Sequence, residues 1–194
     1  MARTKEFDPD AALRSALELF WRRGYEATSM ADLVAHLGIG RASIYATFGN
    51  KHDLYLKALD RYAEDRDPQL LDELSRPGPA LPGVRALVRR FAAEAGSEEL
   101  RRNGCFVTNT AAELGPHDPE AARRVERSWE QIETLLHSAL VRARTQGELP
   151  GERDPRALAR LLLVLLQGLR VTGKASGDPA RVRDAAEQAL ALLD

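Results

Sequence analysis

The amino-acid sequence predicts an all-α protein, with a group of short helices at the N-terminus and a larger helical body behind it. Apolar residues recur at helical spacing along most of the 194 residues, whereas the alternating pattern typical of strands is missing. Asp-Pro pairs at 8–9, 118–119, 154–155 and 178–179 each place a capping carboxylate before a proline suited to the first helical position. These pairs predict four helix starts.

Capping signals divide the first 65 residues into four predicted helices. Ser29 and Asp32 have the spacing of a capping box, and so do Asn50 and Asp53. Gly24 follows the first predicted helix, and glycine at that position can take the left-handed conformation that commonly ends a helix. The predicted ranges are 9–23, about 29–36, 41–47 and 51–65.

A run rich in proline and glycine separates the N-terminal helices from the body. The segment 77–83 contains three prolines and two glycines, which interrupt helices. We therefore predict one domain over residues 1–62 and a second over 63–194. The helices expected in the body are 84–96, 104–114, 119–146, 155–174 and 179–193.

Composition excludes several classes of protein. The formal net charge of -1 gives no global attraction to polyanions. The single cysteine excludes an intramolecular disulfide and suits a reducing compartment. The apolar run 161–166 is far shorter than the roughly 20 residues that span a membrane, and the N-terminus lacks a signal peptide. We expect a cytoplasmic protein without a membrane contact.

The stretch "LGIGRASIYATFGNKHDLY", residues 37–55, matches a helix-turn-helix. Its second helix would lie in the major groove of double-stranded DNA, with bases meeting residues near its N-terminus. Arg41 can bridge two guanine acceptors, Ser43 suits several bases, and Ala42 can touch a thymine methyl. The alternative is a compact helical corner with Tyr45 and Phe48 in its core.

Other residues of this region are candidates for phosphate contacts. Tyr45 and Thr47 carry hydroxyl groups, and Lys51 stands at a predicted helix N-terminus, where a cation and free amides together favour an anion. Such contacts orient a protein on DNA rather than specify sequence. Ile44 and Phe48 are expected to point the other way, into the core.

The segment from about residue 9 to 59 resembles the DNA-binding domain of TetR-family transcriptional regulators. The elements "GY", "TSMADL", "LGIG" and "IYATFGNKHDL" stand in that family's order and spacing. The resemblance implies an all-α fold: an N-terminal three-helix DNA-binding domain with a helix-turn-helix, and a larger effector-binding and dimerisation body. It implies a homodimer on operator DNA and adds Thr28 and Ser29 to the DNA-binding candidates. Gly40 departs from the serine that many members carry as a helix cap.

The run "RALARLLLVLLQGLRV" is apolar on more than one face. Under the resemblance, part of it would meet the same helix of a second subunit. The alternative is a central helix buried on all sides within one subunit.

Cys105 is the candidate for a chemical sensor. It stands near a predicted helix N-terminus and close to Arg101 and Arg102, and both features favour a thiolate. The alternative is a small buried residue without reactivity. The segment "NGCFVTNTAAEL" with the later "LLQGLRVTGKAS" resembles the NemR-like branch of the family. That resemblance implies a cysteine that reacts with electrophiles or oxidants, assisted by a lysine at the position of Lys174.

A reversible small hydrophobic ligand is the other effector that the sequence leaves open. The candidate residues in the body are aromatic or amide-bearing: Phe91, Phe106, Asn109 and Trp129. No cofactor is expected, and the four histidines lack metal-ligand spacing. An enzyme would need a histidine beside Cys105, which nothing in the sequence provides. A purely structural helical module would leave the polar face of residues 41–47 unexplained.

Overall fold

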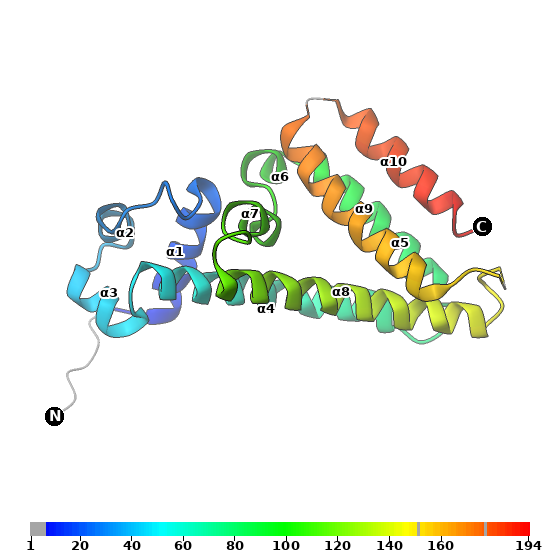
Figure 1. Ribbon diagram of the computed structural model, residues 1–194, viewed down its shortest axis with the longest axis horizontal. Helices are drawn as coiled ribbons and strands as arrows, with labels where there is room; N and C mark the ends of the chain where they lie inside the picture. The colour runs from blue at the N-terminus through cyan, green and yellow to red at the C-terminus, as the bar shows by residue number, and fades with distance from the viewer. Residues whose placement is uncertain (1–6, 151, 177) are drawn as a thin grey trace.

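A computed structural model describes residues 7–150, 152–176 and 178–194, and every regular element in these ranges is a helix (Figure 1). The helices are α1 (Pro9–Arg23), α2 (Met30–Leu37), α3 (Arg41–Phe48), α4 (Lys51–Ser75), α5 (Leu81–Ala95), α6 (Glu98–Asn103), α7 (Phe106–Glu113), α8 (Pro119–Thr145), α9 (Pro155–Ala175) and α10 (Pro179–Ala191). The all-α prediction is confirmed.

The predicted helix starts are confirmed in atomic detail. At the four Asp-Pro pairs predicted to start helices, each aspartate accepts a backbone N–H from the first turn of α1, α8, α9 or α10. Both capping boxes form, at the starts of α2 and α4. Gly40 precedes α3 without a side-chain cap, as its lack of a side chain requires.

Two predicted boundaries in the middle of the chain are wrong. The helix expected to end near residue 65 continues to Ser75, with Pro68 inside it. Leu70 and Leu74 of this extension are buried against the body, and that burial outweighs the unfavourable proline. Pro82 was expected to lie in a segment that interrupts the helices, yet it lies in the first turn of α5. A backbone N–H at that position has no partner within the helix, so its absence from proline has no cost.

Helix α6 was missed because it is only 6 residues long. It begins where the Ser97 hydroxyl accepts the Leu100 N–H at 3.2 Å. Its single buried side chain, Leu100, provides no periodic pattern that a sequence window would detect.

The helices form two regions connected by α4 (Figure 1). Helices α1–α3 gather at one end around the start of α4, while α4 continues beneath α8 into the other region. Helices α5, α8 and α9 pack together there, and α10 lies along the outer edge.

The hydrophobic core consists of two clusters, one in each region. The first contains α1–α3 and the start of α4, and it also includes Phe106 and Val125 from α7 and α8. The second contains the end of α4 with α5, α8, α9 and α10. Residues from beyond position 100 thus complete the core around the N-terminal helices, and the predicted division between residues 62 and 63 lies within the continuous helix α4.

Polar contacts tie α1, α4 and the loop between α1 and α2 to the body. The Glu113 carboxylate accepts the backbone N–H groups of Tyr25 and Glu26 at 3.1 and 2.9 Å. The Trp21 indole N–H donates to the Gly104 carbonyl at 2.8 Å. The hydroxyls of Tyr55 and Thr110 form a buried hydrogen bond of 2.8 Å. A shift of α7 would therefore disturb α1 and α4 directly.

No helix in the described ranges combines the length and the apolar character needed to cross a membrane.

The contact between His52 in α4 and Asp118 at the start of α8 yields a prediction about stability and pH. Although burial raises the pKa of Asp118, the Ala121 and Glu120 amides and the His52 ring outweigh it, so this pKa lies below its ordinary value of 3.8. Asp118→Asn keeps a capping side chain but loses the charge, and it should reduce the free energy of unfolding by about 0.5 to 1 kcal/mol at neutral pH.

A carboxyl group whose pKa is lowered by folding stabilises the folded state at pH values above its unfolded-state pKa. This contribution to the free energy of unfolding is lost as the pH falls through the folded-state pKa. Urea unfolding should therefore show the difference between wild type and Asp118→Asn shrinking from about pH 5 to about pH 2. Asp178→Asn serves as the control, because it removes the charge of a helix-capping aspartate that has no histidine beside it in the described residues. A difference that stays constant with pH would contradict the role of the Asp118 charge.

Candidate DNA-binding surface and sensor site

Helix α3 divides into a buried and an exposed face. Ile44 and Phe48 are buried in the N-terminal cluster, as predicted. Arg41, Ala42, Tyr45 and Ala46 are exposed, and Tyr45 keeps 46% of its surface accessible. The compact-corner alternative placed Tyr45 in the core and is wrong on that point. The exposed face pairs a cation with small residues that permit close approach to a base edge.

Ser43, Thr47 and Lys51 border this face. All three are half-buried. The Lys51 ammonium donates to the Tyr25 carbonyl at 2.8 Å and lies 4.0 Å from the centre of the Tyr25 ring. Since an ammonium has three donors, it retains capacity for a phosphate. Arg41 makes no salt bridge within the part of the chain that the structure describes.

Thr28 does not belong to this surface. Its side chain is fully buried, and its hydroxyl donates to the Gly24 carbonyl at 2.7 Å. The threonine thus stabilises the turn after α1, and its side chain offers nothing to DNA in this conformation. Ser29 remains exposed, with its hydroxyl donating to Asp32 in the α2 capping box.

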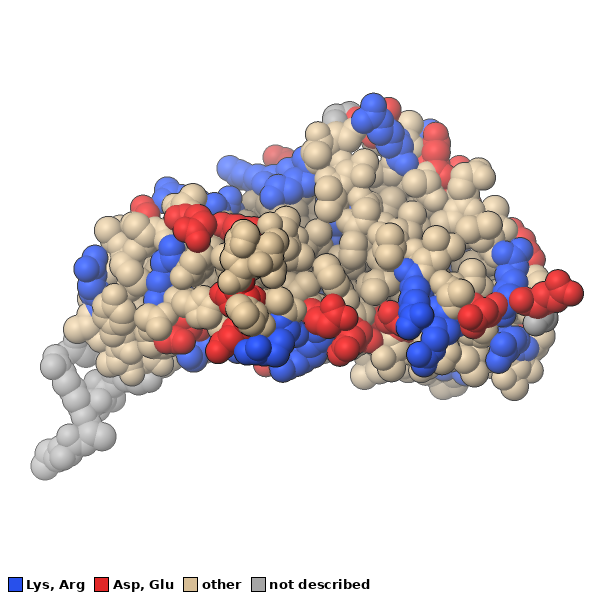
Figure 2. All heavy atoms as spheres, viewed as in Figure 1, with Lys and Arg blue, Asp and Glu red and all other residues tan. Residues whose placement is uncertain are grey.

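The visible surface carries mixed charge. Figure 2 shows lysine and arginine side chains interspersed with aspartate and glutamate over the end formed by α1–α3 and over the body. On this face the positive charges do not gather into a broad basic field.

Helix α9 presents an apolar stripe to solvent. Leu161, Val164 and Val171 are 45%, 69% and 54% exposed, and Gly168 lies between them with open space in front of it. The opposite face, with Leu162, Leu166 and Leu169, is buried. The alternative of a helix buried on all sides is therefore wrong.

Cys105 lies at the junction between the two regions. It is the residue before α7 and only 2% exposed. The Arg170 guanidinium of α9 donates to its sulfur at 3.0 Å. The same guanidinium lies 4.2 Å from the centre of the Phe91 ring. Arg101 and Arg102, which were expected to favour the thiolate of Cys105, are instead exposed on α6. Arg170 is the arginine that contacts the sulfur.

The surroundings of Cys105 favour its thiolate. Burial raises the pKa of the thiol, but the positive charge of Arg170 and hydrogen bonding by Thr108 outweigh it, so the pKa lies below its ordinary value. Burial also raises the pKa of the neighbouring Tyr62 hydroxyl, so that tyrosine stays neutral. The chemistry available here is nucleophilic attack by a buried sulfur.

Lys174 lies close to this segment without contacting the sulfur. Its ammonium donates to the Asn109 side-chain oxygen at 3.2 Å. The Asn109 amide in turn donates to the Asn103 carbonyl at 2.7 Å. A Cβ added to Gly104 would meet Lys174 Cδ at 2.7 Å, so the chain beside Cys105 is tightly enclosed.

The structure does not bring the predicted ligand residues into one cavity. Phe91 and Arg170 line a cavity of only about 50 Å³. Phe106 is buried among aromatic rings of the N-terminal cluster. Trp129 packs against the edge of that cluster, with its indole nitrogen buried and unpartnered. Within the described ranges no group of three or more acidic, histidine or cysteine side chains could hold a metal ion.

Sequence reasoning missed Arg170 and Glu113. Arg170 stands in an otherwise apolar run, four residues before Lys174, so the two share a helix face. A cation inside such a run was the available signal, because a buried charge requires a partner. No local sequence pattern indicated the role of Glu113, because the two backbone N–H groups that its carboxylate accepts lie 87 and 88 residues away.

Comparison with known proteins identifies both parts of the chain. Residues 12–58 match the family described as "Bacterial regulatory proteins, tetR family". Residues 80–189 match the family described as "Tetracyclin repressor-like, C-terminal domain".

Several individual proteins are similar over nearly the whole chain. An uncharacterized HTH-type transcriptional regulator, YezE of Bacillus subtilis, is 40% identical with full coverage of both chains. The HTH-type transcriptional repressor ComR of Escherichia coli is 34% identical over 89% of this chain and 82% of its own. A cysteine mutant of the TetR family regulator CifR, in complex with 26-bp operator DNA, is 30% identical with a TM-score of 0.86 and full coverage of both chains.

Reduced E. coli NemR has the same fold, with a TM-score of 0.85 at 18% identity and coverage of 95% and 96% of the two chains. The relatives are regulators of transcription rather than enzymes. The chain belongs to the TetR family of transcriptional regulators.

Proposed function

We propose that this DNA-binding regulator is a cytoplasmic homodimeric repressor that reads operator DNA with α3 and is released when Cys105 is alkylated or oxidised. The observation that carries the DNA-reading proposal is the exposed face of α3, with Arg41 and Ala42 at its start. The relatives support it, because ComR is named a repressor and CifR was solved on operator DNA.

The dimer proposal depends on the apolar stripe of α9. Solvent-exposed Leu161, Val164 and Val171 are unfavourable in a monomer, and a second copy of the same helix would cover them. Gly168 in the middle of the stripe permits close approach of two helices. A dimer would place two copies of α3 on the two halves of one operator.

The release proposal depends on the pairing of Cys105 with Arg170. The sulfur of a thiolate adds to the electrophilic carbon of an activated alkene. An S–C bond forms as the C=C π bond breaks, and water supplies a proton to the adjacent carbon and leaves hydroxide. The product sulfur is neutral, so the buried guanidinium loses its counter-charge. Because Cys105 is only 2% exposed, the added group would have to displace its neighbours, and α7 with its contacts to α4 and to the loop after α1 would have to shift.

The second candidate is release by a reversible hydrophobic ligand, with Cys105 in a structural role. The burial of Cys105 favours it, because a 2% exposed sulfur reacts only after local opening. The cavity lined by Phe91 and Arg170 measures only about 50 Å³, whereas small-molecule sites usually measure about 300 to 1,000 Å³, so such a ligand would have to bind elsewhere in the body.

Arg41→Ala tests the reading of DNA by α3. We expect affinity for DNA from upstream of the protein's own gene to fall by about 5- to 150-fold, with a much smaller loss on unrelated DNA. Fluorescence anisotropy measures both. Arg144→Ala, an exposed arginine at the end of α8, should bind as wild type does. Equal losses on both DNAs would make Arg41 a backbone contact.

Val164→Glu tests the dimer. A carboxylate in the centre of the apolar stripe should shift the sedimentation coefficient from that of a dimer to that of a monomer at micromolar concentration. Ala185→Glu, on an exposed part of α10, serves as the control. If Val164→Glu sediments as wild type does, α9 is not the dimer interface.

Cys105→Ser tests the trigger. We expect the variant to bind operator DNA in the absence of reagent and to stay bound when N-ethylmaleimide releases the wild type, because serine lacks the nucleophilic sulfur. Anisotropy of the preformed complex measures release, and intact-mass spectrometry measures the adduct. Equal release of both proteins would exclude the thiol as the trigger.

Arg170→Gln tests the cause of the thiol's reactivity. Removing the cation should raise the pKa of Cys105, so the pH profile of alkylation should move toward higher pH. An unchanged profile would mean that Arg170 does not govern the thiolate.

A further inference from the structure

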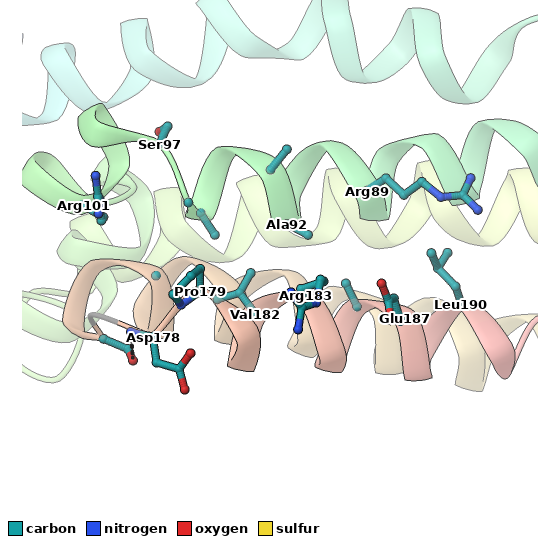
Figure 3. Close-up of a pocket in the computed structure, with 16 residues that line it drawn as sticks. Arg89, Ala92, Ser97, Arg101, Asp178, Pro179, Val182, Arg183, Glu187 and Leu190 are labelled. Atoms are coloured by element: carbon teal, nitrogen blue, oxygen red, sulfur yellow. Dashed lines mark hydrogen bonds between the residues drawn. The ribbon is translucent and has the colours of Figure 1, made fainter.

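A cleft separate from the sensor site lies between α5 and α10. It has a volume of about 620 Å³, within the range of ligand sites. The end of α9 and the segment around α6 close one end of it. Figure 3 shows Ala92 and Arg89 of α5 on one side and Val182, Arg183, Glu187 and Leu190 of α10 on the other.

The floor of the cleft is built from small and apolar residues. Ala95 of α5 meets Gly173 of α9 so closely that a Cβ on Gly173 would lie 2.4 Å from the Ala95 carbonyl oxygen. Val182 and Ala186 of α10 are buried and complete the floor. A flat apolar ligand group would remove this surface from water.

The rim of the cleft carries unpaired arginines. Arg89 and Arg101 line it, and neither forms a salt bridge in the described residues. Arg183 also lines the cleft and is bonded to its neighbour Asp184 at 3.0 Å. Asp178 lies at the same end as Arg101 (Figure 3), but its carboxylate caps α10 by accepting the Ala180 N–H at 2.9 Å. Arg101 is therefore the cation available to an anion at that end.

Dimerisation through α9 would leave the cleft open. Gly173, which contributes to the cleft, belongs to the buried face of α9. The apolar stripe of Leu161, Val164 and Val171 lies on the opposite face of that helix. The cleft is also distinct from the small cavity beside Arg170, since the two share no lining residue.

We propose that this cleft binds a small apolar carboxylate, with the apolar group on the floor of Ala92, Val182 and Ala186 and the carboxylate on Arg101. A planar guanidinium matches a carboxylate in two parallel hydrogen bonds. The small residues of the floor leave room for an aromatic ring.

The position of Arg101 also connects the cleft to the N-terminal helices. Arg101 belongs to α6, and α6 leads directly into Gly104, whose carbonyl accepts the Trp21 indole N–H of α1. A ligand that draws Arg101 toward the cleft would act on that contact. This coupling rests on the proposed function as a regulator, whereas binding to the cleft does not.

Titration calorimetry with 1-naphthylacetate and its neutral amide tests the site in the absence of DNA. We expect saturable binding of the carboxylate with a Kd below about 1 mM, and binding of the amide at least about tenfold weaker. Arg101→Gln should weaken carboxylate binding about tenfold, and Arg102→Gln, its exposed neighbour outside the cleft, should not. Ala92→Phe should abolish binding by filling the cleft, whereas Ala86→Phe, exposed on the same helix, should not.

Equal affinity for the carboxylate and the amide would overturn the anion site, and no saturable binding of either would overturn the ligand site altogether. Equal effects of Arg101→Gln and Arg102→Gln would place any binding elsewhere. The operator affinity of the ligand-free protein is measured separately, so failure of the proposed regulator and failure of this site give different results. Circular dichroism confirms that each variant is folded.

Discussion

The packing of α7 against α4 and against the loop after α1 is the interaction on which the rest of the molecule depends. Phe106 lies edge-on to Tyr55 and Tyr62, with ring centres 5.2 and 5.7 Å apart. These rings join in one core two helices whose aromatic residues lie more than 40 positions apart in the sequence. Because such cores are close-packed, α7 has no free space in which to move alone. Any change at α7 must therefore be passed to the helices that carry α3.

Arg170 places a positive charge in the buried part of the molecule. A buried guanidinium is costly unless charge and hydrogen bonds compensate it. Its partners are the Cys105 sulfur and the face of Phe91, and its Nε has no partner in the described residues. The buried Arg170 cation is therefore stabilised largely by one partner, the Cys105 sulfur. A surface arginine depends less on any single carboxylate. The same arrangement lowers the pKa of the Cys105 thiol, because the positive charge of Arg170 favours the thiolate over the neutral thiol.

The sequence predicted what short-range interactions determine. Helix caps and the buried face of α3 need only three or four neighbouring residues, so the starts of α1, α2, α4 and α8 were predicted correctly. The extension of α4 past Pro68 and the pairing of Arg170 with Cys105 depend on packing between distant segments. The burial of the Thr28 side chain was missed because its hydroxyl donates to a carbonyl inside the turn after α1, a contact that the sequence pattern does not show.

Two separate connections limit how the N-terminal helices can move relative to the body. The first is the continuous helix α4, which bridges both core clusters. The second is α7, held by the Glu113 carboxylate at the Tyr25 and Glu26 amides and by Trp21 at Gly104. Two attachments between rigid parts prevent free swivelling and leave mainly a rotation about the line that joins them. Cys105 follows Gly104 directly, and Arg101 of the proposed cleft lies three residues before it, so a local change at either residue would act on this second attachment.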